Sequence, residues 1–308
     1  MFCVCGEALW DLFARDEGDG RSLGLTARIG GSPFNVAVGL ARLGREALFF
    51  SGISTDRMGA RLAAALEAEG VRMDLVQRVP ERTTLSLVDV AEDGGPSYQF
   101  YGEGAADRAL RDAPALPDAA WGLHFGSYAL VSQPVGATLE ALAAREAGRR
   151  LITLDPNVRL NVEPDVEVWR AAVERHAGRA GLIKVSAEDL GLLWPGVAAA
   201  EVAARWRAGG AALVIVTDGA AGSTAWGPFG EISAPGRKVE VADTVGAGDT
   251  FMAALIAGLD RRGLRDAAAL AGISRGDAGA LLAEATDAAA ITVGRVGADL
   301  PRADEVYG

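Results

Sequence analysis

Short apolar segments alternate with longer amphipathic ones along most of this 308-residue chain, and this rhythm restricts the fold more than any other feature. Parallel strands need helical crossovers, so the alternation predicts an α/β protein with a mostly parallel sheet and helices on both faces. Half of the residues are hydrophobic, which is enough to bury the core of one large domain over 1–308. The expected strands lie at 2–9, 47–52, 121–126, 150–154, 181–185 and 213–217. The expected helices lie at 35–44, 56–70, 134–146, 249–259 and 278–290.

The stretch from Val239 to Leu259, VEVADTVGAGDTFMAALIAGL, predicts a strand end, a turn with two glycines and a helix. Gly246 and Gly248 let a ligand approach the backbone, and the free N–H groups at a helix start attract anions. Asp249 stands where a helix N-cap would stand. It either caps the helix or acts as a general base beside an anion hole, and these residues alone leave both roles open.

Polar residues after the first strands are candidates for the same site, because ligands of open α/β sheets bind outside the carboxyl ends of the strands. Asp11 follows the first expected strand, with a solvated turn as the alternative role. Gly30 and Gly31 likewise precede a helix and let a ligand approach the backbone closely. Asn35 would either bond a ligand hydroxyl or cap that helix, and the cap is the simpler interpretation.

Later strand ends carry further candidates. Arg159 follows the strand at 150–154, where its planar guanidinium would bind a phosphate. The alternative is an ordinary surface arginine. Glu188 and Asp189 follow the strand at 181–185, where they would cap the next helix or reach a metal through water.

The strand at 213–217 leads into a glycine turn. The spacing of Thr217, Gly219 and Gly222 would let backbone amides meet a nucleotide phosphate, which is a weak signal alone. No GxxxxGK[ST] motif occurs, so the chain is not expected to be a P-loop enzyme.

Residues 84–104 break the strand–helix rhythm by alternating apolar and polar residues on both sides of Asp93-Gly94-Gly95. This pattern predicts an antiparallel hairpin. A hairpin inserted into a parallel sheet suggests a lid, with Phe100 and Tyr101 on its inner side. The alternatives are a hairpin that has no role at the site and a hairpin that forms the edge of a dimer.

Charge and cysteine usage restrict the partners. The net charge is −11 with no dense Lys/Arg cluster, which argues against nucleic-acid binding. Cys3 and Cys5 are expected to be buried strand residues in a reducing compartment, and two histidines leave little material for a zinc site. No stretch approaches the length of a membrane span, so a cytoplasmic protein is expected.

Two stretches together resemble the two signatures of the PfkB sugar-kinase family, also called ribokinase-like. They are GGSPFNVAVGLARLG from Gly30 and DTVGAGDTFMAALI from Asp243. The resemblance extends over the chain through GEALWDLF, FYGEGAADRAL, DPNVRL, KVSAED, TDGAAGS and AAITVGRVGADLP, and is strongest to bacterial fructokinases. It implies a three-layer α/β/α domain with a small β lid, built from about 14–29 and 84–104.

The resemblance also implies roles for individual residues. The catalytic group comprises the base Asp249, the anion hole formed by the amides of Ala247, Gly248 and Asp249, the preceding Gly246, and Arg159 near the transferred phosphate. The sugar-binding group comprises Asp11, Gly30, Gly31, Asn35, Phe100 and Tyr101. The ATP-binding group comprises Lys184, Thr217, Gly219, Gly222 and Gly248. K⁺, held mostly by backbone carbonyls, would lie among Asp243, Val245, Thr292, Arg295 and Gly297.

Two departures from the family pattern bear on these roles. Ser186 replaces the Asn of the N-x-x-E motif, whose acidic end aligns with Asp189, a candidate for holding Mg²⁺ through water. Gly102 stands where relatives often carry a lid arginine that meets the carboxylate of a sugar acid. An uncharged sugar is therefore expected.

The function that follows is transfer of the ATP γ-phosphoryl group to a primary hydroxyl of a neutral sugar, fructose first, with Mg²⁺ as cofactor and K⁺ as activator. The alternatives are 2-keto-3-deoxygluconate, ribose or a nucleoside as acceptor, or a sugar sensor without catalysis. The family also implies a homodimer formed through the lid.

Overall fold

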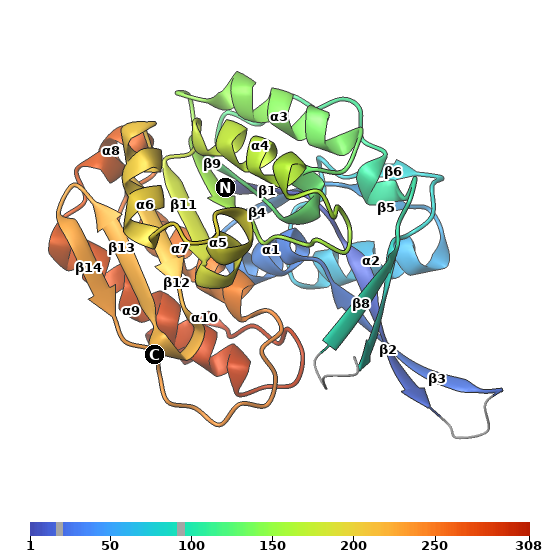
Figure 1. Ribbon diagram of the computed structural model, residues 1–308. Helices are drawn as coiled ribbons and strands as arrows, with labels where there is room; N and C mark the ends of the chain where they lie inside the picture. Colours follow the sequence, from blue (N-terminus) through green and yellow to red (C-terminus); the bar gives the residue numbers. More distant parts are fainter. Residues whose placement is uncertain (17–20, 91–95) are drawn as a thin grey trace.

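A central sheet of eight strands organises the molecule, and it confirms the predicted α/β fold. The computed structural model describes residues 1–16, 21–90 and 96–308 (Figure 1). The strands are β1 (Phe2–Cys5), β4 (Ala47–Phe50), β9 (Gly122–Gly126), β10 (Leu151–Asp155), β11 (Leu182–Ser186), β12 (Leu213–Thr217), β13 (Ser223–Gly227) and β14 (Gly230–Ala234). Their order is β14-β13-β12-β11-β10-β9-β1-β4, with the strands from β12 to β4 parallel and β13 and β14 antiparallel.

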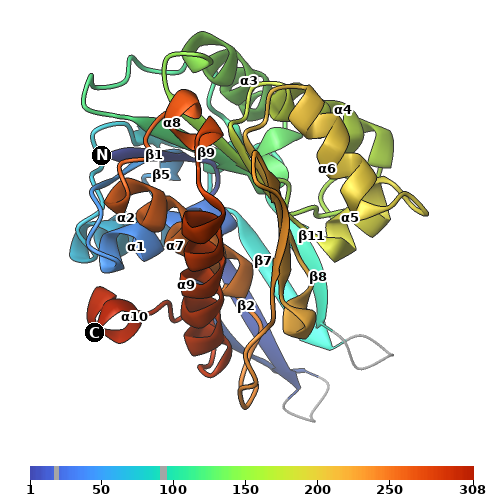
Figure 2. The same ribbon diagram turned by 90° about the vertical axis from the view of Figure 1, so that its left-hand side faces the viewer.

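Helices cover both faces of this sheet, as predicted (Figure 2). One face carries α1 (Ser32–Arg42), α2 (Arg57–Ala68), α7 (Ala247–Arg261), α8 (Ala267–Ala271) and α9 (Arg275–Val293). The other carries α3 (Val135–Glu146), α4 (Val166–Ala177), α5 (Ala187–Leu193) and α6 (Ala199–Ala208). A last helix, α10 (Ala303–Tyr307), packs on α9. Helix α7 is buried from Asp249 through Leu259, so its position is set by the core.

A second sheet projects from the body beside the carboxyl edge of the first. It contains β2 (Leu9–Asp16), β3 (Leu23–Gly30), β7 (Leu85–Val90) and β8 (Pro96–Tyr101) in the order β3-β2-β7-β8, and we call it the lid sheet (Figure 1). The antiparallel pairing of β7 with β8 confirms the predicted hairpin. Its turn at 93–95 lies outside the described residues, as does 17–20 of the segment at 14–29.

The structure corrects several predicted boundaries. The strand predicted at 2–9 ends at Cys5, because Gly6 turns the chain with a φ of 144° and β2 then starts the lid. Asp11 therefore lies within a lid strand instead of in a turn after β1. The strand predicted at 47–52 is interrupted at Ser51, which separates β4 from β5 (Gly52–Ser54), the partner of β6 (Gln77–Val79).

Two helix starts and one strand also differ from prediction. Helix α1 begins at Ser32, three residues before Asn35, so Asn35 is not its cap. Helix α7 begins at Ala247 with Gly246 as its N-cap, so Asp249 lies inside the first turn. The strand end predicted at 239–242 is absent from the structure, which has no regular element between β14 and α7.

The buried cysteines agree with prediction. Cys3 and Cys5 are both fully buried in β1, with their Sγ atoms 3.7 Å apart. None of the helices in the described ranges is long and apolar enough to cross a lipid bilayer.

Candidate active site

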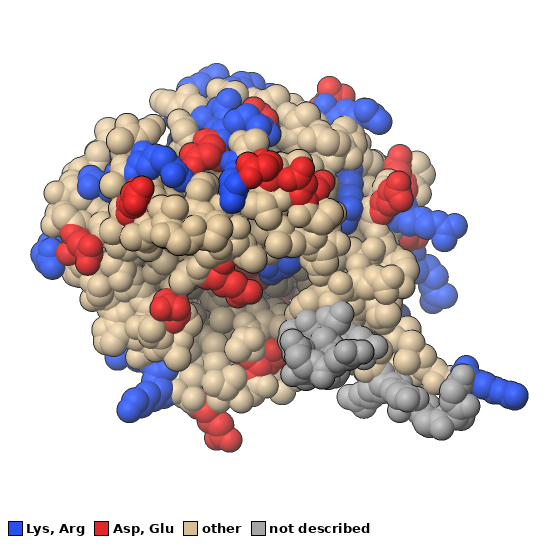
Figure 3. Space-filling model, in the orientation of Figure 1, with Lys and Arg blue, Asp and Glu red and all other residues tan. Residues whose placement is uncertain are grey.

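The candidate residues gather where the carboxyl edge of the main sheet faces the lid sheet. Figure 3 shows a hollow between the body and the lid, with acidic side chains at its rim and a basic one inside. Helix α1 starts directly after the lid strand β3, and its first turn meets the first turn of α7 through hydrogen bonds from Ser32 and Asn35 to Asp249. The site thus lies between the carboxyl edge of the main sheet on one side and the lid sheet on the other.

The first turn of α7 supplies the candidate base. Gly246 takes a left-handed φ of 80°, and a Cβ there would lie 2.7 Å from the Cβ of Ala298, so the turn requires glycine. Asp249 is the third residue of the helix, and its side chain does not cap it. Its carboxylate accepts hydrogen bonds from Ser32 Oγ (2.6 Å) and from Asn35 Nδ2 (2.8 Å). An acid in this position also interacts favourably with the helix dipole.

A buried ion pair lies directly beneath this turn. Lys184 Nζ donates to Asp155 Oδ2 over 2.8 Å, and a Cβ on Gly248 would come within 3.1 Å of the same ammonium. Burial alone would lower the pKa of Lys184, but the carboxylates of Asp155, Asp189 and Asp249 outweigh it and raise that pKa. Burial raises the pKa of Asp155 to about 6 against the opposing effect of Lys184. The first turn of α7 therefore has a buried positive charge below it.

The segment after β11 organises its helix differently from the prediction. Ser186 is the N-cap of α5, with its Oγ accepting from the N–H of Asp189 (2.9 Å), so neither Glu188 nor Asp189 caps the helix. Asp189 Oδ1 instead accepts from the N–H of Val158 (3.0 Å), which ties α5 to the loop after β10. Asp155 Oδ1 is buried without a hydrogen-bond partner. Asp155 and Asp189 thus leave carboxylate oxygens that suit a hydrated Mg²⁺.

The other end of the site contains Asp11, which lies in the lid strand β2. It lies opposite Ser86 in the register of β2 and β7. Burial raises the pKa of Asp11 to about 6, while the Ser86 hydroxyl and the charge of Arg159 oppose this rise. A half-buried carboxylate of this kind is a good acceptor for ligand hydroxyls.

Arg159 lies nearer to this end than the prediction implied. Its charge acts on Asp11, on Glu7 and on Tyr98, and its Nη1 donates to the carbonyl of Val158 (2.9 Å). The cation that the structure places beside Gly248, in the first turn of α7, is Lys184.

Glu7 lies deeper at this end and was not predicted as part of the site. Burial raises the pKa of Glu7 to about 8, although the Ser127 hydroxyl and the charge of Arg159 lower it. The peptide oxygen of Glu7 lies behind Gly31, where a Cβ would approach it to 2.8 Å. Gly31 also has a φ of 106°, and a Cβ on Gly30 would clash with the carboxylate of Asp11. Both glycines are therefore needed for packing the site.

The two predicted lid residues fall on opposite faces. Phe100 is opposite Ser86 in the β7–β8 register, so it shares the inner face with Asp11 and packs edge-on against Tyr128 (5.6 Å). Tyr101 is opposite Leu85 and is 55% exposed on the outer face. Tyr98 takes the inner position instead: burial and the charge of Asp11 raise its pKa. Side chains alternate between the two faces of a strand, so an inner position for Phe100 implies an inner position for Tyr98, two residues earlier. This alternation is the sequence signal that could have identified Tyr98.

Gly102 has a neighbour that the sequence did not reveal. A Cβ there would lie 2.8 Å from Nη2 of Arg108, whose guanidinium stacks over Tyr128 at 4.8 Å. A positive charge therefore does lie beside this part of the lid, although it comes from the short helix at Ala106–Arg108. The inference of an uncharged sugar from Gly102 alone is weakened by this contact.

The predicted ATP-binding turn follows β12. Thr217 ends that strand, and Gly219 has a φ of 48° with open space around its Cα. Gly222 has a φ of 104°, and a Cβ there would press on the backbone of Ala234 to Gly236. Gly222 is therefore required for packing, whereas the backbone at Gly219 is open to a ligand.

The predicted cation loops are tied together by Asp243. Its Oδ1 accepts from the N–H of Val245 (3.0 Å) and its Oδ2 from the N–H of Gly297 (2.9 Å). The Thr292 hydroxyl pairs with that of Thr250 (2.8 Å), and the Arg295 guanidinium pairs with Glu305. These side chains hold the loops in place through hydrogen bonds and an ion pair. No cluster of three or more His, Cys, Asp or Glu suited to a metal occurs within the described ranges.

The pKa of Asp11 leads to a testable pH dependence. We expect the KM for the sugar that the family resemblance implies to rise below about pH 6, by up to roughly tenfold per unit, because protonated Asp11 is a poorer acceptor. Steady-state kinetics from pH 5 to 8 measure this. In Asp11→Asn the KM should be raised and independent of pH. A KM in the wild type that stays flat down to pH 5 would contradict the role of Asp11.

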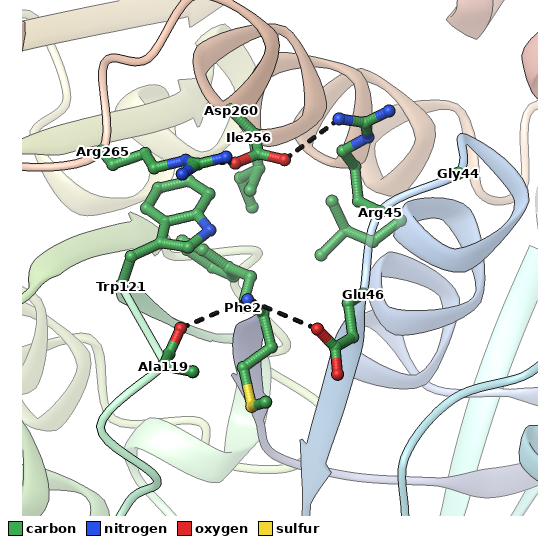
Figure 4. Close-up of a pocket in the computed structure, with 11 residues that line it drawn as sticks. Phe2, Gly44, Arg45, Glu46, Ala119, Trp121, Ile256, Asp260 and Arg265 are labelled. Carbon is green, nitrogen blue, oxygen red and sulfur yellow. Dashed lines mark hydrogen bonds and ion pairs between the residues drawn. The ribbon is translucent and has the colours of Figure 1, made fainter.

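A well-formed cavity elsewhere does not belong to this site. It measures about 250 Å³ and is lined by Arg45, Glu46, Trp121, Asp260 and Arg265 among others (Figure 4). It lies at the C-terminal ends of α1 and α7, whereas the candidate residues lie at their N-terminal ends. Helix α7 has 15 residues, so the two regions are roughly 20 Å apart.

Comparisons with known proteins identify relatives of the whole chain. The model of the pfkB family carbohydrate kinases matches residues 1–304. A fructokinase of Rhizobium leguminosarum bv. trifolii is 40% identical over 263 residues, covering 84% of this chain and 79% of that protein. The crystal structure of a Xylella fastidiosa fructokinase with bound ATP superposes with a TM-score of 0.90 at 27% identity, covering 99% of this chain and 96% of that one.

A second solved structure is similar. It is a Vibrio cholerae O395 fructokinase in a form with bound fructose, ADP and calcium ion, with a TM-score of 0.84 at 27% identity over 99% of this chain and 97% of that one. These likenesses confirm the predicted ribokinase-like fold.

Proposed function

Because this chain belongs to the PfkB family of carbohydrate kinases, we propose that it transfers the γ-phosphoryl group of ATP to a primary hydroxyl of fructose, giving fructose 6-phosphate. The observation that carries this proposal is the placement of Asp249. Its buried carboxylate lies between Asn35, from the predicted sugar-binding helix, and the turn above Lys184. The similar fructokinases support fructose as the acceptor.

The proposed reaction divides the site between two ends. At the lid end, Asp11 accepts hydrogen bonds from sugar hydroxyls, while Asn35 and Arg159 orient the ring. At the body end, Asp249 takes the proton of the primary hydroxyl as its oxygen attacks the γ-phosphorus, and the bond from phosphorus to ADP breaks. The N–H groups at 246–248 and the ammonium of Lys184 stabilise the charge that develops on the phosphoryl oxygens.

Two cations are part of the proposal. Asp155 and Asp189 would hold hydrated Mg²⁺, which neutralises phosphate charge during transfer. Backbone carbonyls of the loops that Asp243 joins would hold K⁺. The unpartnered Asp155 Oδ1 and the two backbone bonds of Asp243 support these assignments. Equal turnover in Na⁺ and K⁺ would remove the second one.

The proposal is tested by ADP release with Mg-ATP. The acceptors are fructose, ribose, adenosine, glucose and 2-keto-3-deoxygluconate. We expect fructose to give the highest kcat/KM. A preference for the keto-acid would mean that Arg108 beside Gly102 accommodates a carboxylate. ATP binding without turnover on any acceptor would favour a sugar sensor.

The lid sheet supports a further part of the proposal, a homodimer. The register places Leu23, Leu25 and Tyr101 on its outer face, where they are 55%, 51% and 55% exposed. An apolar sheet face of this kind suits a second copy of the same face in a two-fold dimer.

We therefore expect a dimer in solution that Leu25→Asp weakens roughly 100-fold, because each copy would bury an unpaired carboxylate. Light scattering coupled to size exclusion, over a range of concentrations, measures this. The matched control is Val168→Asp, which puts the same charge at an exposed valine on α4. A wild type that is monomeric at high concentration would contradict the dimer.

A further inference from the structure

Ser32 makes a contact that its place in the sequence does not explain. It is the first residue of α1, but the helix has Gly31 as its N-cap and no side-chain capping bond. Its hydroxyl instead reaches across to Asp249, 217 positions later in the chain, over 2.6 Å. Both side chains are buried, so water does not compete for this bond. The hydroxyl of Ser32 therefore does not cap its own helix, α1. It contacts instead the candidate general base Asp249 on α7.

The geometry locks the orientation of that base. Ser32 holds Oδ1 and Asn35 holds Oδ2, so a rotation of the carboxylate about χ2 would break two hydrogen bonds at once. The distance of 2.6 Å falls in the range of hydroxyl-to-carboxylate bonds, which are shorter and stronger than neutral ones. Each carboxylate oxygen has room for a second hydrogen bond, so an acceptor hydroxyl can still approach.

The two donors differ in what they have left for a ligand. Asn35 keeps its amide oxygen and a second N–H, which can contact a sugar while one N–H holds Asp249. The single proton of Ser32 is used on Asp249. A change at Asn35 is thus expected to alter both sugar binding and turnover, whereas a change at Ser32 acts through the base.

We propose that Ser32 is a positioning residue, which aims the carboxylate of Asp249 at the acceptor hydroxyl. This inference rests on the proposed role of Asp249 as base. A base that is misaligned by a small angle loses proton-transfer efficiency without loss of substrate binding. Ser32 is thus a determinant of kcat and not of sugar affinity.

The sharpest test compares Ser32→Thr with Ser32→Val, two side chains of the same shape that differ by the hydroxyl. We expect the Val variant to lose kcat by roughly 10-fold relative to the Thr variant, the worth of one hydrogen bond to a charged group, with sugar KM within about 2-fold. Ser32→Ala should give the same loss. The control is Ser51→Ala, which removes a buried hydroxyl that donates to the carbonyl of Gly52.

Two readouts separate positioning from a structural role. In an Asp249→Asn background, Ser32→Ala should cause no further loss, because the residue acts through the carboxylate. A crystal structure of Ser32→Ala should show the Asp249 carboxylate rotated or in two orientations. Equal kcat in the Thr and Val variants would overturn the proposal, and so would a raised sugar KM with an unchanged kcat.

Failure of the proposed function would be visible separately. A wild type without acceptor-dependent ADP release would refute the kinase assignment. The crystal structure of Ser32→Ala would still test the positioning, and an unmoved Asp249 would refute it.

Discussion

Replacing Asp249 with asparagine should lower kcat by a factor on the order of 10² to 10⁴ while the protein stays folded, because a well-placed general base is lost. The amide has the shape of the carboxylate, and its oxygen still accepts from Ser32 or Asn35. One of those donors loses its partner, which costs about 1 kcal/mol of the free energy of unfolding. Steady-state ADP release, with the melting temperature as a check of folding, measures both effects.

The control for this variant lies on the same helix. Asp260→Asn changes an aspartate near the other end of α7, where it pairs with Arg45 and Arg265. Its kcat should stay within about 2-fold of the wild type, because it lies roughly 16 Å along the helix from the proposed chemistry. If Asp249→Asn turned over as fast as this control, Asp249 would not be the base.

The second large effect is expected at Lys184, where stability and activity should separate. Lys184→Met leaves the carboxylate of Asp155 buried without its partner, and breaking a buried pair in this way costs about 3–5 kcal/mol of the free energy of unfolding. It also removes the cation under the anion hole. The kcat should therefore fall by roughly 10² to 10³, as when a transition-state donor is deleted.

The double variant Lys184→Met with Asp155→Asn distinguishes the two contributions. Removing both charges should restore the free energy of unfolding to within about 1–2 kcal/mol of the wild type, because no uncompensated charge remains buried. Turnover should not recover, because the double variant lacks both the Lys184 cation and the proposed Mg²⁺ ligand Asp155. Urea denaturation and ADP release measure the pair of outcomes. Recovery of activity in the double variant would show that Lys184 serves only as the partner of Asp155.

The sequence predicted the parts of this molecule that depend on local signals. The turn at 243–248, the strand Leu213–Thr217 and the β7–β8 hairpin each have glycines or hydrophobic periodicity within a few residues, and the structure has all three. The break after Cys5 was missed because β2 continues in extended conformation, and only its pairing with β7 assigns it to the lid.

The contacts within the site were not predictable in the same way. Ser32 and Asp249, or Asp155 and Lys184, meet only when distant segments pack, and nothing near either residue in sequence indicates its partner. Tyr98 and Tyr101 illustrate a different difficulty. Both are lid tyrosines, and the face that each occupies depends on a register that a shift by one residue would invert.

The position of Asp249 on a helix buried along most of its length has a consequence for how such an enzyme can change. A substitution in the packing of α7, such as a larger residue at Gly258 against Leu281, would displace the base and be selected against for loss of turnover. The inner face of the lid strands is outside this buried helix and is the face proposed to contact the acceptor. New acceptor preferences should therefore be easier to evolve, or to engineer, through Tyr98, Phe100 and their neighbours, with the phosphoryl-transfer machinery inherited unchanged.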